Sequence, residues 1–106
     1  MLYNFEKEFG VKINYSLNSN PEEMYTKLQT GVSFDVVVTS DYMIERLIKE
    51  KELKPINWDN ITHKDDIDPD NMGYAFDPDN TYSVPYFVGT VGILYNHNVV
   101  DEEDLR

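Results

Sequence analysis

A run of β-forming apolar residues leads without a spacer into a helical pattern in the first half of this chain. The run extends from Phe34 to Thr39 and includes three consecutive valines, Val36–Val38. Apolar side chains on consecutive positions predict a strand covered on both faces, as in a parallel sheet under helices. The helical pattern that follows is carried by apolar residues at helical spacing: Met43, Ile44, Leu47 and Ile48. A covered strand joined directly to a helix favours the α/β class.

The residues before this unit predict more elements of the same kind. Helical spacing at the very start indicates that the chain begins inside a helix, which Gly10 ends. Strict apolar/polar alternation over residues 11–17 predicts a strand with one buried face. Asn20 is a typical helix cap, Pro21 suits the first helical position, and Gly31 ends that helix. The resulting order predicts a mainly parallel sheet with helices on both faces.

The second half of the chain is less regular. Residues 57–81 show no periodicity and are dominated by turn residues, which predicts a long loop. Residues 82–87 indicate a short strand, and Pro85 within it favours an edge position. Residues 91–95 predict a further buried strand. No domain boundary is visible, and the length of 106 residues fits one domain or part of one.

Charge and composition exclude several classes of function. The net charge is −11, from 20 acidic against 9 basic residues, so a phosphate-binding surface for nucleic acid is not expected. There is no cysteine, which excludes disulfides and thiolate chemistry. No apolar run approaches the roughly 20 residues of a transmembrane helix, and no signal peptide is visible in this chain.

The acidic and histidine residues do not predict a metal site, a cofactor site or a catalytic centre. Four aspartates have the spacing of a calcium loop, but Asn71 stands where the sharp turn needs glycine. These four residues are Asp66, Asp68, Asp70 and Asp77. His63 and His97 each lack a second ligand at helical spacing. We therefore expect an acidic surface loop and surface histidines.

The step Ser40-Asp41-Tyr42 is the best candidate for a binding site. It lies between the predicted strand and its helix, and open α/β sheets bind ligands where strand ends meet helix starts. Ser40 is also a natural helix cap, and both roles stay open. The chain has eight tyrosines, whose rings attract organic cations within about 6 Å.

Three segments, in this order, resemble the spermidine/putrescine-binding proteins of bacterial ABC importers. They are SNPEEMY from Ser19, SDY from Ser40, and YSVPY from Tyr82 with the following GTxG. The resemblance runs nearly end to end and implies a periplasmic-binding-protein-like lobe of type II. Residues 1–106 would form part of the N-terminal lobe, without its first strand and without the second lobe.

The resemblance also implies a function. Such proteins are periplasmic or anchored at the cell surface, are not enzymes, and deliver a polyamine held between two lobes to the membrane permease. The Ser40 hydroxyl would accept a hydrogen bond from an ammonium group, and Tyr42 would offer its ring and hydroxyl to the methylene chain or the amine. Asp41 is left unassigned, and Val88 departs from the tryptophan common in the family. A binding protein for another small solute and an α/β enzyme domain remain as alternatives.

Two expectations concern the chain by itself. It should bind polyamine weakly or not at all, because the resemblance implies that the family's main carboxylates and the opposing wall lie in the missing parts, the first strand and the second lobe. A sheet without its central strand would leave unpaired edges, so the chain is expected to dimerise or to exchange elements with a second copy.

Overall fold

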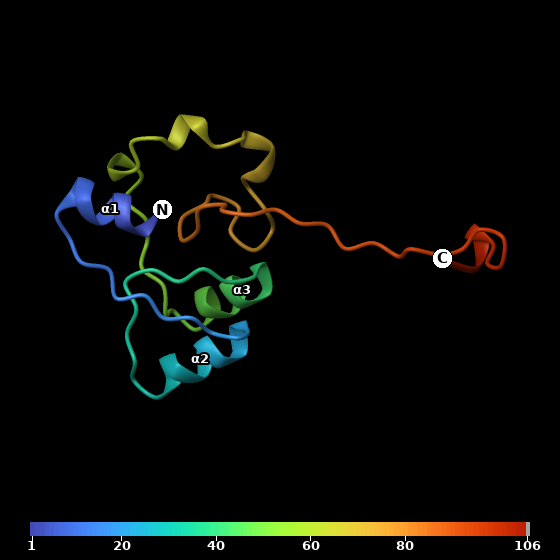
Figure 1. Ribbon diagram of the computed structural model, residues 1–106, viewed down its shortest axis with the longest axis horizontal. Coiled ribbons are helices and arrows are strands. Elements are labelled where there is room, and N and C mark those ends of the chain that lie inside the picture. Colours follow the sequence, from blue (N-terminus) through green and yellow to red (C-terminus); the bar gives the residue numbers. More distant parts are fainter. Residues whose placement is uncertain (106) are drawn as a thin grey trace. The chain divides into compact units, whose positions relative to one another are not determined.

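The computed structural model describes residues 1–105, except for the side chain of Leu105 (Figure 1). Three α-helices are present: α1 (Leu2–Phe9), α2 (Pro21–Gln29) and α3 (Asp41–Lys49). Four short 3-10 helices follow: η1 (Trp58–Asn60), η2 (Lys64–Asp66), η3 (Pro69–Asn71) and η4 (Glu102–Leu105). The chain divides into two compact units, Met1–Leu53 and Lys54–Arg106. Among the described helices, none has the length and apolarity needed to cross a membrane.

The helix ends lie where the sequence predicts them. Gly10 follows α1 in the left-handed conformation, with φ of 64°. Asn20 caps α2, since its Oδ1 accepts a hydrogen bond from the Glu23 N–H at 2.8 Å. Glu23 reaches back and accepts from the Ser19 N–H at 2.7 Å, which completes a reciprocal capping arrangement. The predicted stop of α1 at Gly10 and the predicted cap of α2 at Asn20 are therefore confirmed.

The core of the first unit lies between α2 and α3. Its buried apolar side chains are Met24 of α2 and Met43 and Leu47 of α3. Met43 and Leu47 are one turn apart, so both project from the same face of α3. Half-buried apolar residues pack around these three: Tyr25, Leu28, Phe34, Val37 and Leu53. The predicted apolar stripes of the two helices are confirmed as the packing faces.

The predicted parallel sheet is not confirmed. Residues 11–17 and 34–39 run as extended chain without a β-ladder, and no strand occurs in residues 1–105 (Figure 1). Val37 is half-buried, whereas Val36 and Val38 are 83% and 73% exposed, so the prediction that both faces are covered is wrong for this structure. An extended segment becomes a strand only when a neighbouring chain pairs with its backbone. The described residues supply no such neighbour here.

The second unit has the irregular structure predicted for residues 57–81, but two of its predicted strands are absent. Residues 82–87 form no ladder, so the edge-strand assignment of Pro85 is not confirmed. Residues 91–95 are exposed rather than buried, with Val91 and Leu94 fully open to solvent. The backbone within the first half of this unit is joined by a bond from the Ile56 N–H to the Thr81 carbonyl at 2.8 Å.

Candidate functional site

Ser40 occupies the cap position of α3, but its side chain does not act as a cap. Its backbone is extended, with φ of −78° and ψ of 157°, and its carbonyl accepts from the N–H groups of Met43 and Ile44. The hydroxyl makes no capping hydrogen bond. Instead, the Asp41 carboxylate accepts from the Tyr42 N–H at 2.7 Å. Ser40 is an exposed residue.

Tyr42 is tied to the neighbouring helix through its hydroxyl. The phenol donates to Oε1 of Glu22, in the first turn of α2, at 2.8 Å. The ring itself is 50% exposed. The bond to the Glu22 carboxylate raises the pKa of Tyr42 above its ordinary value, since a phenolate there would face a second negative charge. Tyr42 is thus bonded to α2 through its hydroxyl while the residue stays half-exposed.

A second tyrosine–glutamate pair joins the same two helices. Tyr25 of α2 donates its hydroxyl to Oε2 of Glu50, just after α3, at 2.8 Å. Here a cation completes the group: Arg46 bonds Glu50 at 2.9 Å and stacks over the Tyr25 ring, 3.8 Å from its centroid. The Arg46 guanidinium and the Tyr25 hydroxyl together lower the pKa of Glu50.

In the second unit, a buried carboxylate organises the loop before residue 84. Asp77 is 4% exposed and accepts hydrogen bonds from the backbone N–H groups of Thr81, Tyr82 and Ser83. The Ser83 hydroxyl donates a fourth bond to the same carboxylate at 2.7 Å. Asp77 was a candidate calcium ligand by spacing, and its oxygens are instead occupied by donors of its own chain.

Asn80 closes the same loop from the other side. Its backbone is left-handed, with φ of 47°, which asparagine tolerates better than most residues. The side-chain oxygen accepts from the Gly73 N–H at 2.7 Å, and the side-chain amide donates to the Ser83 carbonyl at 3.2 Å. The indole of Trp58 donates to the Asn80 carbonyl at 2.8 Å.

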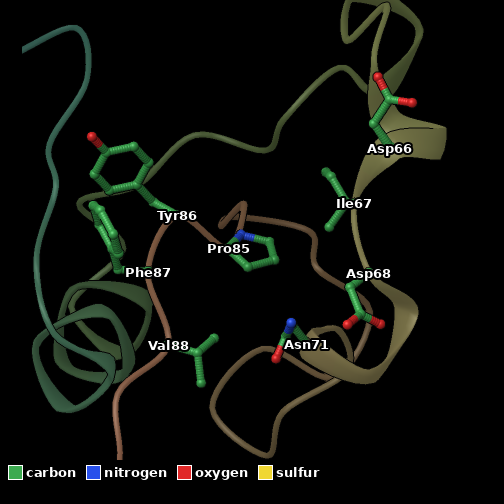
Figure 2. Close-up of a pocket in the computed structure, with 8 residues that line it drawn as sticks. All are labelled: Asp66, Ile67, Asp68, Asn71, Pro85, Tyr86, Phe87 and Val88. Carbon is green, nitrogen blue, oxygen red and sulfur yellow. The ribbon is translucent and has the colours of Figure 1, made fainter.

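A shallow, open pocket of about 340 Å³ lies beyond this loop (Figure 2). Tyr86 and Phe87 lie together on one side of it, with ring centroids 4.6 Å apart in an edge-to-face arrangement. Ile67 and Asn71 point into the space from the opposite side (Figure 2). Its remaining lining residues are Asp66, Asp68, Pro85 and Val88. The pocket therefore combines aromatic and acidic groups.

The four aspartates that have the spacing of a calcium loop do not form a metal site within residues 1–105. The Asp66 carboxylate lies 3.1 Å from Nδ1 of His63, and Asp68 accepts from the N–H of Asp70. Within residues 1–105, no three metal-binding side chains converge. Apart from the buried Asp77, these aspartates are exposed, as expected of an acidic surface loop.

The fold of this chain is similar to that of a solved solute transport protein. A solved structure from Listeria monocytogenes, named for a spermidine/putrescine ABC transporter, superimposes with a TM-score of 0.77 at 39% identity. The match covers 81% of this chain and 27% of that one. The architecture is thus that of a periplasmic-binding-protein-like lobe, a class that binds solutes and is distinct from enzymes.

The family follows from the sequence comparisons. The family model for bacterial extracellular solute-binding proteins matches residues 1–106, and the chain belongs to that family. The spermidine/putrescine-binding periplasmic protein of Escherichia coli K12 is 36% identical over 107 aligned residues, covering 99% of this chain. A putrescine/agmatine-binding protein of Pseudomonas aeruginosa is 37% identical over 95 aligned residues, covering 87% of this chain. The chain spans 31% and 26% of the lengths of these two relatives.

Sequence reasoning missed two features of the site. The sequence does not indicate the contact of Glu22 with Tyr42, because that contact depends on how α2 and α3 pack. The signal available was its place in the SNPEEMY segment. Asp77 was missed as the centre of its loop, since no periodic pattern marks a carboxylate that binds nearby backbone N–H groups.

Proposed function

We propose that this chain supplies one wall of the polyamine site of a two-lobe solute receptor, which serves an ABC importer outside the cytoplasm. The observation that carries the proposal is the pairing, at the start of α3, of an exposed Ser40 hydroxyl that caps nothing with a half-exposed Tyr42 ring. A polyamine alternates ammonium groups with methylene segments. It therefore needs alternating acceptors and apolar faces, which a hydroxyl beside a ring provides.

The electrostatics of this step also suit a cation. The start of a helix carries a partial positive charge, which by itself would repel an ammonium group. Asp41 in the first turn of α3 and the nearby Glu22 carboxylate oppose that charge. The relatives named for spermidine, putrescine and agmatine support the choice of a polyamine over other solutes.

The whole receptor is larger than this chain in our proposal. Residues 1–106 form part of the N-terminal lobe of a type II binding protein, and a first strand and a second lobe lie outside them. Residues 11–17, 34–39, 82–87 and 91–95 become strands of a mainly parallel sheet with helices on both faces. The closed form, with polyamine between the lobes, is what the permease subunits recognise.

The test of the binding function compares the full-length protein with two variants. Calorimetry should show binding of spermidine or putrescine, while Ser40→Ala and Tyr42→Ala each weaken it about tenfold, a loss of roughly 1.4 kcal/mol. Tyr3→Ala is a matched control, since Tyr3 is an exposed tyrosine on α1. A full-length protein that binds sugars or iron and no polyamine would refute the proposal.

The 106-residue chain alone has a different expected behaviour. It should give little or no heat with polyamine, because the opposing lobe is absent from it. We also propose that it dimerises or exchanges elements with a second copy, since the apolar segments 34–39 and 91–95 are largely exposed. Light scattering at high protein concentration checks this, and a uniform monomer there would argue against it.

A further inference from the structure

The two tyrosine–glutamate pairs between α2 and α3 differ in one respect. In the Tyr25–Glu50 pair, both side chains contact the Arg46 guanidinium, which bonds the carboxylate and stacks over the ring. In the Tyr42–Glu22 pair, the phenol and the carboxylate share the same kind of bond, at the same 2.8 Å. No Lys, Arg or His among residues 1–105 forms an ion pair with Glu22. The Tyr42–Glu22 pair therefore lacks a cation of the kind that Arg46 supplies to the Tyr25–Glu50 pair.

The phenol fixes the hydrogen-bond roles in the Tyr42–Glu22 pair. Tyr42 has one hydroxyl proton, and that proton is donated to Glu22. The lone pairs of the phenol oxygen are left for other donors, and the carboxylate keeps further acceptor positions. An ammonium group carries only donors, so it is complementary to both oxygens. A carboxylate or a carbonyl group of a solute would meet acceptors alone.

We propose that Glu22 is a further ligand-binding residue, and that the Glu22 carboxylate and the Tyr42 phenol together take one ammonium group of the solute. The ring of Tyr42 then lies beside the methylene segment, as the Tyr25 ring lies under Arg46. This inference rests on the proposed polyamine function, because Tyr42 is a ligand residue only under that proposal. It makes the pair a determinant of specificity for cationic amines.

The chain offers a matched control in the neighbouring residue. Glu23 also lies in the first turn of α2, but its carboxylate bonds the Ser19 N–H and Lys27 rather than Tyr42. Glu22→Gln and Glu23→Gln therefore remove the same charge from the same helix turn. Glutamine also supports a capping arrangement at position 23, so neither change should disturb the start of α2.

The experiment measures putrescine and spermidine binding by the full-length protein and these two variants. Glu22→Gln should raise the Kd about tenfold, whereas Glu23→Gln should change it less than about twofold. Loss of affinity to the same extent in both variants would overturn the inference, as a general effect of acidic charge would explain it. Unchanged affinity in Glu22→Gln would also overturn it. A wild-type protein that binds no polyamine would instead refute the proposed function.

A second measurement does not depend on ligand binding. The phenol titration of Tyr42 is followed by ultraviolet difference absorbance against the Tyr42→Phe variant. Glu22→Gln should move the midpoint of that titration to lower pH, since the Glu22 carboxylate raises the pKa of Tyr42. Glu23→Gln should leave the midpoint unchanged. An unmoved midpoint in Glu22→Gln would show that the contact is absent and would overturn the inference even where polyamine binds.

Discussion

Single polar side chains in this protein range from fully bonded to unpaired. The buried Asp77 carboxylate accepts four hydrogen bonds, so the cost of removing it from water is offset. The Thr39 hydroxyl, one residue before the candidate site, is buried and has no partner within residues 1–105. A buried hydroxyl that lacks a partner costs about 1–3 kcal/mol. Thr39 is therefore a site of local instability beside the candidate binding residues.

Replacing Thr39 with valine should stabilise the chain. Thr39→Val keeps the branched shape and removes the unpaired hydroxyl, so the free energy of unfolding should rise by about 1 kcal/mol. Urea unfolding of wild type and variant measures this difference. Thr30→Val is the control, since its hydroxyl is bonded to the Lys27 carbonyl at 2.8 Å and its loss should bring no gain. A destabilised Thr39→Val would mean that its hydroxyl has a partner in solution.

At the scale of helices and strands, the sequence predicts the features that depend on residues close together in the chain. The caps at Asn20 and Gly10 act within one turn of chain, and the structure has them as predicted. A strand is decided by its neighbour, so the valines of residues 34–39 could indicate an extended segment but could not supply its partner. The contact of Glu22 with Tyr42 likewise joins residues 20 apart in sequence. Local patterns carry no information on such contacts.

The packing of α2 against α3 depends on very few enclosed side chains. Leu47 is fully buried, and among the side chains that the structure describes only Met24 and Met43 are buried apolar residues beside it. Leu47→Ala should therefore lower the free energy of unfolding by about 2–5 kcal/mol. Because the core is so small, this loss should be enough to unfold a large fraction of the chain. Circular dichroism during urea unfolding measures the change. Leu17→Ala is the control, because Leu17 is 75% exposed, and similar losses in both variants would contradict the assignment of the core.

For the molecule as a whole, the structural relative is a solute-binding protein, but the predicted sheet is absent from residues 1–105. The apolar extended segments of the chain are therefore unpaired there. Backbone groups of an extended segment that face water exchange their amide hydrogens quickly. The same groups in a covered sheet are protected.

Amide hydrogen exchange therefore separates the isolated chain from the full-length protein. Residues 34–39 and 91–95 should exchange rapidly in the isolated chain and slowly in the full-length protein, where we propose that they pair as strands. Mass spectrometry of peptides from both proteins gives this comparison. The peptide that contains Leu47 is the internal reference, since it should be protected in both. Rapid exchange of residues 34–39 in the full-length protein would refute the proposed sheet.

The loop around Asp77 has a practical consequence as a self-contained module. Its principal bonds run between its own residues, 73–83, with two more from Ile56 and Trp58. Asp79 lies inside the loop, is exposed, and takes part in none of the side-chain hydrogen bonds found there. A cysteine placed at that position can carry a fluorescent label, and the chain has no other thiol to compete for it. The loop thus offers an attachment point for a dye at a side chain that takes no part in holding the loop together.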